Sequence, residues 1–368
     1  MKKALFITLI LSMLFTMNAC FVGKEMVVWF PGIKDYKHFP SHPLHASPHP
    51  FHFYHSHQTI TPKPVPPFGY DSTMSFEQFL KNNNTTAFLI IRNDTILYEN
   101  YFYGYADSIW GTSFSMAKSF TSGLIGFAVQ DGLININDPI TKYVPELKHP
   151  SMQKVTIKNL LQMTSGIKYI EHYKNPFSSV AIDYYGRNLK HAFHRLKTEV
   201  PPGTRFKYQS INTQLLGFAL KNVLKGKTLT DYLQEKIWTP LGAEFDGSWS
   251  TDRKKNGMEK TFCCINATAR DYAKYGRLYL NQGNWNGQQL LNKEWVINST
   301  KIDTSEGSKP YYQFQWWIPP GTHDFVADGL LGQFIYVSPE RNLIMIRLGK
   351  NEGKINFWQF LVAVSKQF

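Results

Sequence analysis

A helix that is apolar on all its sides constrains this chain more than any other feature. The helical stretch runs from Ser115 to about Gln130 and is ended by Asp131-Gly132. Its large apolar side chains are spread over most of the helical circumference: Met116, Phe120, Leu124, Phe127 and Val129. A helix without a polar face has no side to present to water, so we expect it to lie buried at the centre of the fold.

Strand patterns flank this helix on both sides in the sequence. Residues 87–92 and 96–103 are β-rich runs split by Asn93-Asp94, which predicts a β-hairpin. Residues 333–337 and 343–348 are strand-like runs near the C-terminus. Because these runs enclose a helical middle, we predict one sheet built from both ends of the chain.

The predicted fold class is therefore α+β, an antiparallel sheet flanked by helices with an all-helical lobe inserted at about 133–282. Short helices are predicted over residues 155–163, 213–224 and 230–238. Capping boxes at Ser75 and Thr268 predict two more helix starts, and a last helix is expected over about 357–364. With 368 residues, 43% of them hydrophobic, the chain is long enough to bury a large core.

The first twenty residues have the pattern of a secretory signal. Lys2 and Lys3 precede a short apolar run, and Ala19-Cys20 resembles a bacterial lipoprotein cleavage site. We predict lipidation of Cys20; simple cleavage and an uncleaved anchor are the alternatives. The protein is then expected to be exported, periplasmic and held at the membrane by its lipid. Residues 21–70, rich in Pro and His, are predicted to be a tether and an irregular arm, and residues 71–368 the folded domain.

Several function classes are excluded or left without support by the sequence. The formal net charge is +13, but Lys and Arg are scattered and no nucleic-acid module is recognisable, so no nucleic acid is expected as a partner. The His-rich arm offers metal ligands without fixed geometry, so a plain arm is preferred and no metal site is predicted. No cofactor motif is present. Cys263 and Cys264 are expected to be buried free thiols, because adjacent cysteines rarely bridge each other.

The Ser-x-x-Lys pattern occurs three times, so its position must decide between the copies. The three pairs are Ser115–Lys118, Ser151–Lys154 and Ser165–Lys168. Only Ser115 opens a strongly apolar helix after a strand-like segment, where the helix amides favour an oxyanion. Lys118 lies one turn later on the same face, and burial beside an apolar helix favours its neutral amine. We predict Ser115 as nucleophile and Lys118 as its base.

A second polar motif, Tyr208-Gln209-Ser210, is uninformative by itself. Its setting raises its weight, because a Pro-Pro-Gly turn precedes it and Asn212 opens a helix after it. A tyrosine hydroxyl near an amine and a serine can pass a proton to a leaving group. We predict this role for Tyr208, supported by Ser210.

Taken in order, these motifs resemble the serine β-lactamase and penicillin-binding protein superfamily. The resemblance extends over about residues 70–365 and rests on Ser115-Met-Ala-Lys118, residues 132–146, residues 155–166, Pro202-Gly-Thr204, Tyr208-x-Ser210 and residues 267–278. The Tyr-x-Ser form is similar to the class C-like branch that includes 6-aminohexanoate-dimer hydrolase and related esterases. The resemblance implies a catalytic cleft between two lobes and an acyl-enzyme mechanism that needs no cofactor.

The sequence departs from this family at the third motif, Lys-Thr-Gly. The matching place is 327–333, which contains no lysine, and efficient β-lactam hydrolysis is therefore in doubt. The backbone near Leu330 is expected to supply the second oxyanion N–H beside that of Ser115, and Gln333 is included in this predicted region. Gly329 and Gly332 fit either a close approach of ligand to backbone or a turn.

The sequence thus predicts an exported serine hydrolase that cleaves a small-molecule or peptide amide or ester. A peptidoglycan D,D-carboxypeptidase or β-lactamase of the same fold is one alternative. A lipid-tethered binding protein without catalysis is the other. The substrate walls are expected to come from loops within about 167–195 and 300–330.

Overall fold

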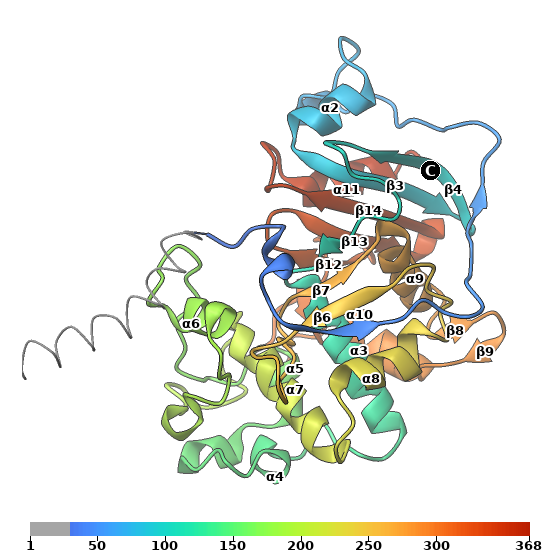
Figure 1. Cartoon of the computed structure of the whole chain (residues 1–368). Coiled ribbons are helices and arrows are strands. Elements are labelled where there is room, and N and C mark those ends of the chain that lie inside the picture. Colours follow the sequence, from blue (N-terminus) through green and yellow to red (C-terminus); the bar gives the residue numbers. More distant parts are fainter. Residues whose placement is uncertain (1–29) are drawn as a thin grey trace, which may run out of the picture.

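The computed structural model describes residues 30–368, and its centre is an eight-stranded sheet (Figure 1). The strand order is β10-β11-β12-β13-β14-β3-β4-β2. The strands are β2 (Tyr54–His55), β3 (Thr85–Arg92), β4 (Thr95–Tyr101), β10 (Tyr312–Gln313), β11 (Trp316–Trp317), β12 (Phe325–Gly329), β13 (Gln333–Ser338) and β14 (Leu343–Gly349). The pairing of β14 with β3 joins the two ends of the chain, which confirms the predicted construction of the sheet.

The predicted N-terminal hairpin is present as β3 and β4. Its turn is made by Asn93 and Asp94, whose φ angles of 50° and 58° lie in the left-handed region. Two-residue turns with positive φ match the right-handed twist of paired strands, and Asn and Asp tolerate that conformation.

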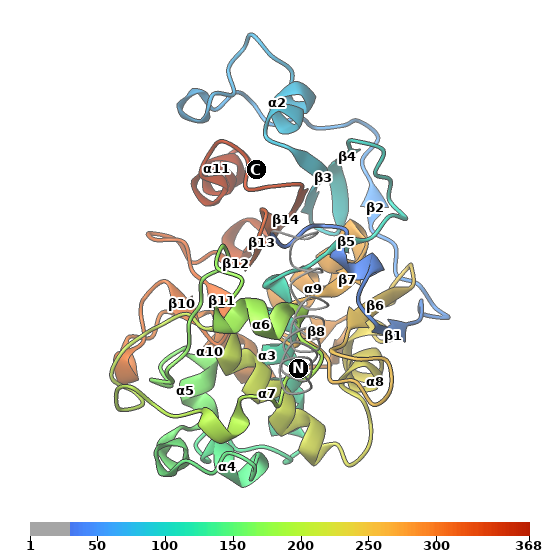
Figure 2. The ribbon, with the colours of Figure 1, turned by 60° about the vertical axis from the view of Figure 1, so that its left-hand side comes forward.

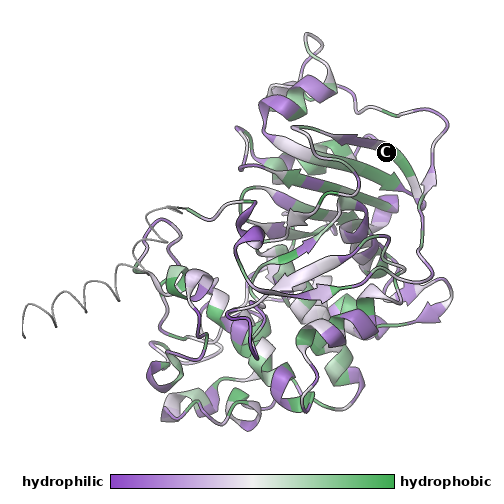
Figure 3. Cartoon of the chain, viewed as in Figure 1, coloured by the Kyte–Doolittle hydropathy of each residue, from purple (hydrophilic) through white to green (hydrophobic). Residues whose placement is uncertain are grey.

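Successive side chains on each strand point to opposite faces of the sheet, and the sheet therefore separates two hydrophobic cores. On β3, Leu89 and Ile91 point into the larger core, whereas Phe88 and Ile90 point into the smaller one. The smaller core is covered by α2 (Phe76–Asn82) and α11 (Phe357–Ser365), and α9 (Ala269–Leu280) packs on the other face against β13 and β14. Figure 3 shows the apolar residues concentrated in the sheet and in the helices beside it.

Helix α3 (Met116–Gln130) is the predicted all-apolar helix, and it lies buried between the sheet and the helical lobe (Figure 2). Its neighbours approach so closely that two positions have no room for a side chain. A Cβ on Gly123 would meet the Tyr275 hydroxyl at 2.4 Å, and one on Gly126 would meet the Trp295 ring at 2.5 Å. The prediction of a central, buried helix is confirmed.

The remaining elements form the helical lobe and its border. The lobe contains α4 (Ile140–Tyr143), α5 (Ile157–Leu161), α6 (Ser179–Tyr185), α7 (Ser210–Val223) and α8 (Leu229–Leu233), which continues as a π-helical turn over Gln234–Trp238. Elsewhere lie α10 (Lys293–Thr300), β8 (Asn284–Trp285) and β9 (Gln288–Gln289).

The predicted range of the helical lobe, 133–282, is wrong at its C-terminal end. β6 (Gly247–Ser250) and β7 (Ile265–Ala267) lie within that range and form a second sheet of order β1-β6-β7-β5, with β1 (Ser41–Leu44) and β5 (Gly111–Thr112). Helix α9 also lies within the range but packs on the main sheet. These strands are short and poor in β-branched residues, and the partners of β1 and β5 are distant in sequence, so no local pattern reveals them.

The prediction of a tether is wrong for residues 30–70, because the segment is docked on the folded domain, whereas its backbone is largely irregular as predicted. In this segment β1 pairs antiparallel with β6, and β2 pairs parallel with β4. The predicted signal and Cys20 lie outside the described residues. Within 30–368, no helix combines the length and the apolar character needed to span a bilayer.

Candidate active site

Ser115 and Lys118 meet at the start of α3 as the spacing predicts. Lys118 Nζ donates to Ser115 Oγ at 2.8 Å and to the carbonyl oxygen of Phe262 at 2.9 Å. The residue before the serine, Phe114, has a φ of 42°, a strained conformation for a residue with a side chain. A sharp turn between β5 and α3 therefore presents the Ser115 hydroxyl.

The electrostatic environment of Lys118 favours a neutral amine. Its side chain is fully buried, and burial lowers the pKa of Lys118 to about 8. The negative charges of Glu171 and Asp328 act in the opposite direction, so desolvation dominates. At mildly alkaline pH, most of an amine with a pKa near 8 is neutral and can accept a proton.

The other two Ser-x-x-Lys pairs lack this arrangement. The Ser165 hydroxyl is buried and donates to Asn212 Oδ1 at 2.6 Å, while Lys168 is exposed. Lys154 is exposed as well, so neither lysine is desolvated. Position on the apolar helix distinguishes the first pair, as predicted.

Tyr208 lies directly over the pair. Its side chain is hydrogen-bonded to Ser115, and Lys118 Nζ lies 5.0 Å from the centre of its ring. Burial raises the pKa of the Tyr208 hydroxyl well above its usual value of 10. The phenol therefore keeps its proton at neutral pH. The predicted trio of Ser115, Lys118 and Tyr208 is brought together.

Ser210 has a different partner from the one expected. Its hydroxyl donates to Glu171 Oε1 at 2.6 Å, and its backbone N–H donates to Glu171 Oε2 at 2.8 Å. Tyr173 donates to the same carboxylate at 2.6 Å. Glu171 is a site residue that the sequence did not reveal, because a single glutamate in a loop, 39 positions from Ser210, carries no signal.

The two other predicted residues lie at the hairpin between β12 and β13. Leu330 lines the same cavity as Ser115. Gln333 does not face that cavity with its amide, because its side chain donates to the carbonyls of Leu330, Leu331 and Gly349. Gln333 thus fastens the turn that carries Leu330.

The two glycines of this hairpin serve different purposes. Gly329 permits a close approach of chain to chain, since a Cβ there would stand 2.2 Å from the Ser113 carbonyl oxygen. Gly332 has a φ of 76° and belongs to the turn. Buried Arg347 donates to the Gly332 carbonyl at 2.6 Å and holds this turn in place.

Asp328, at the end of β12, is a second site residue that the sequence did not reveal. Burial raises the pKa of its carboxyl to about 7, against the effect of the hydrogen bond that it accepts from Trp358. The Trp358 Nε1–Oδ2 distance is 2.8 Å. The family's third motif would carry a lysine in this region, and this chain carries a carboxyl group instead.

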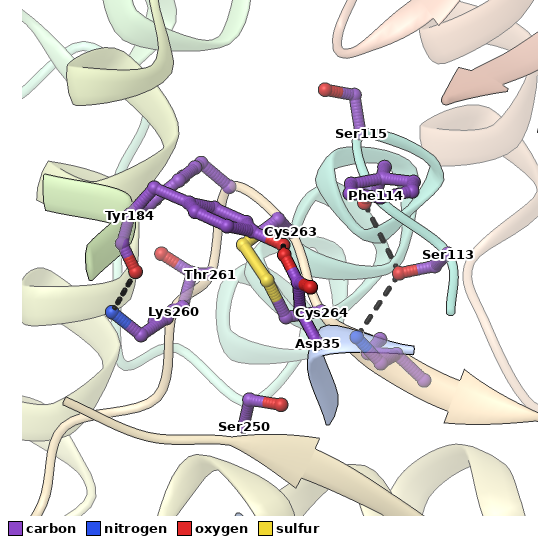
Figure 4. The surroundings of a disulfide bond; sticks show 12 residues. Asp35, Ser113, Phe114, Ser115, Tyr184, Ser250, Lys260, Thr261, Cys263 and Cys264 are labelled. Carbon is purple, nitrogen blue, oxygen red and sulfur yellow. Dashed lines mark hydrogen bonds between the residues drawn. A yellow bond between two sulfur atoms is a disulfide. The ribbon is translucent and has the colours of Figure 1, made fainter. Parts of the chain in front are cut away.

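The expectation of free thiols at Cys263 and Cys264 is wrong, because the two residues form a disulfide bond. Their predicted burial is confirmed. Cys264 has a φ of 75°, which bends the chain at this point. Figure 4 shows the ring of Tyr184 beside the disulfide. Phe262, whose carbonyl accepts from Lys118, directly precedes the bridge.

A narrow cavity of about 30 Å³ opens beside the nucleophile. Its lining is aromatic and apolar apart from the two serines: Pro31, Phe114, Ser115, Tyr173, Val180, Ala181, Tyr184, Tyr185, Ser210, Phe262, Cys263 and Leu330. No formally charged side chain is among the residues that line it. Over residues 30–368, no cluster of three or more His, Cys, Asp or Glu side chains is placed to hold a metal ion.

Comparison with known proteins places this geometry in context. The family model described as Beta-lactamase matches residues 76–356. The 6-aminohexanoate-dimer hydrolase of Paenarthrobacter ureafaciens is 27% identical over 298 residues, which are 74% of each chain. A Bacillus anthracis structure with the provisional description 6-aminohexanoate-dimer hydrolase has a TM-score of 0.77 at 25% identity, covering 90% of this chain and 92% of its own. A family VIII carboxylesterase has a TM-score of 0.63 at 16% identity, covering 79% and 94%, and shares the fold.

Proposed function

This chain belongs to the Beta-lactamase family and has the fold of its hydrolases, and from that premise we propose that it cleaves an amide or ester through an acyl-enzyme on Ser115. The observation that carries the proposal is the 2.8 Å contact between a fully buried lysine amine and the Ser115 hydroxyl. A serine hydroxyl needs an adjacent base to become a nucleophile, and a desolvated amine is such a base.

The steps follow from the positions of the side chains. Lys118 accepts the Ser115 proton as Oγ attacks the substrate carbonyl. The backbone N–H groups of Ser115 and Leu330 stabilise the oxyanion of the tetrahedral intermediate. Tyr208, protonated and next to both groups, passes its proton to the departing amine or alcohol and takes up the proton that Lys118 had accepted. Water then attacks the acyl-enzyme and gives a proton to the neutral Lys118, which returns it to Ser115 Oγ as the acyl group leaves.

The charges around the site favour substrates that place no carboxylate beside residues 327–333, where the family's Lys-Thr-Gly motif would lie. Glu171 and Asp328 act on Lys118 electrostatically, and no lysine stands in residues 327–333 to pair with a substrate anion. β-Lactams and D-Ala-D-Ala peptides carry such an anion, and burying it near Asp328 is unfavourable. The name of one relative, 6-aminohexanoate-dimer hydrolase, supports amide cleavage as the reaction class.

The predicted signal over residues 1–20 supports a location outside the cytoplasm. The Cys263–Cys264 disulfide agrees with that proposal, since disulfides persist in oxidising compartments. Membrane attachment through Cys20 remains part of the proposal and is testable by metabolic labelling with a fatty acid.

The experiment that tests the function is ester hydrolysis by the purified protein and its Ser115→Ala variant. We expect turnover of p-nitrophenyl acetate and labelling by a fluorophosphonate, both lost in Ser115→Ala, with nitrocefin and D-Ala-D-Ala peptides turned over far more slowly. Equal turnover by both proteins would reject Ser115 as nucleophile. Fast nitrocefin turnover without ester hydrolysis would favour a β-lactamase instead.

A further inference from the structure

The N-terminal segment of the described chain reaches the catalytic serine. Residues 30–39 lie against α6, and buried Pro31 lines the cavity that also contains Ser115 and Tyr184. In Figure 1 this dark blue segment enters beside α6 before it turns down to β1. A part of the chain predicted to be an arm is thus a part of the substrate cavity.

A buried carboxylate fixes the segment at its centre. Asp35 Oδ2 accepts from the Tyr184 hydroxyl at 2.9 Å and from the backbone N–H of Gly32 at 2.9 Å. The first of these bonds ties the segment to α6, and the second closes the short turn that carries Pro31. Burial raises the pKa of Asp35, and the two hydrogen bonds oppose that shift.

Aromatic packing fixes the segment at its C-terminal end. The ring of Phe39 meets Tyr184 edge-on, with 5.2 Å between ring centres. Lys260 Nζ lies 5.1 Å from the centre of the Phe39 ring while donating to backbone carbonyls at the end of α6. The Pro40 carbonyl then accepts from the Thr251 N–H at 2.7 Å. The segment is therefore held at Asp35 and Phe39, and the chain is held again at Pro40, directly after it.

The cavity that the segment lines through Pro31 is narrow and apolar. Its volume is about 30 Å³, against about 10–15 Å³ for one water molecule, so it offers little room for a long chain. Its lining excludes charge, because an ion without a partner is costly to bury.

We propose that residues 30–39 are a specificity-determining wall of the active site, which limits the enzyme to short, uncharged acyl groups. This inference rests on the proposed function, since the acyl group is the one that Ser115 binds. Pro31 forms the wall, and Asp35 holds it in place. Without the hydrogen bonds of Asp35, Pro31 is free to move away from the cavity, and longer acyl chains can bind there.

The first test compares p-nitrophenyl octanoate with p-nitrophenyl acetate. For Asp35→Ala we expect the octanoate-to-acetate ratio of kcat/KM to rise at least about tenfold over the unsubstituted protein, because each buried methylene adds to binding. For Pro31→Ala we expect a rise of about threefold from the added space. The matched control is Asp246→Ala, which removes an exposed carboxylate that accepts from the Ala46 N–H of the same arm at 2.8 Å. Its ratio should be unchanged.

The second test measures binding without catalysis. Calorimetric titration of octanamide into Ser115→Ala should give weak binding, strengthened at least about fivefold by adding Asp35→Ala. Circular dichroism checks that each variant is folded, and Pro31→Ala serves if Asp35→Ala is not. Unchanged ester ratios together with unchanged octanamide binding would overturn the wall. Absence of both ester turnover and fluorophosphonate labelling in the unsubstituted protein would overturn the proposed function instead, and the titration would still decide the wall.

Discussion

Lys118 and Lys260 are both fully buried and have similarly lowered pKa values, but their hydrogen-bonding partners differ. Burial lowers the pKa of each to about 8. Lys118 donates to a serine hydroxyl and one carbonyl. Lys260 donates to the carbonyls of Asp183, Tyr184 and Gly186, at 3.0, 2.7 and 3.4 Å, at the C-terminal end of α6.

The difference between them lies in what the amine can do with a proton. At Lys118 the adjacent hydroxyl has a proton to give, so the neutral amine is a base. At Lys260 every hydrogen-bonding partner is an acceptor, and the end of a helix favours a cation. Lys260 is thus a structural clamp. A lowered lysine pKa identifies a desolvated site, and the partner atom decides whether that site is catalytic.

The largest effect is expected on removal of the catalytic amine. Lys118→Ala should lower kcat for ester hydrolysis by a factor on the order of 10³ or more, because nucleophile and base act as a unit. The double variant with Ser115→Ala should lose little further activity. Steady-state kinetics on p-nitrophenyl acetate measure this. A change confined to KM would make Lys118 a binding residue and remove the contrast with Lys260.

Removal of the second amine should affect stability rather than chemistry. Lys260→Met leaves three backbone carbonyls without their donor, and we expect a loss of roughly 3 kcal/mol in the free energy of unfolding. The kcat of the folded protein should stay within about tenfold of the original. Denaturant titration and kinetics measure the two quantities. A loss of kcat as large as that of Lys118→Ala, in a folded protein, would make Lys260 part of the catalytic apparatus.

The pH dependence tests the charges around Lys118. The base must be neutral, so kcat/KM should rise with pH through a midpoint near 8. Asp328 and Glu171 both raise the pKa of Lys118, so neutralising either should lower it. For Asp328→Asn we expect the midpoint to move to lower pH, whereas Asp252→Asn, near Lys260, should leave it in place. If the midpoint did not move in Asp328→Asn, a group other than Lys118 would control the fall of kcat/KM at low pH.

The smallest effect is expected at the disulfide that follows Phe262. A Cys263→Ser/Cys264→Ser variant frees the backbone beside the carbonyl that accepts from Lys118, and we expect kcat to fall by about three- to tenfold, comparable to about one hydrogen bond. Iodoacetamide labelling with and without a dithiol measures the state of the cysteines. Unchanged kcat would show that the Lys118–Phe262 contact does not depend on the bridge.

Several elements of the fold were predictable because their signals are local. The Asn93-Asp94 turn, the Ser75 and Thr268 helix caps and the apolar helix after Ser115 all depend on residues within one or two turns. The second sheet was missed, because β1 and β6 are separated by some 200 residues and neither has a strong strand pattern by itself.

The candidate site divides in the same way. Ser115 and Lys118 are three residues apart on one helix, and helical geometry alone brings them together. Glu171, Asp328 and Pro31 come from a loop, the end of a strand and the N-terminal segment. No spacing in the sequence relates them to the serine.

The sequence by itself determined a buried helix and a hydroxyl–amine pair at its start, since these follow from the period of the helix and the hydrophobic effect. Only the tertiary structure decided which charges surround the amine, that Cys263 and Cys264 are joined, and that Pro31 lines the cavity beside Ser115. The physical reason is that contacts between distant segments depend on how whole elements pack, and packing is a property of the assembled core.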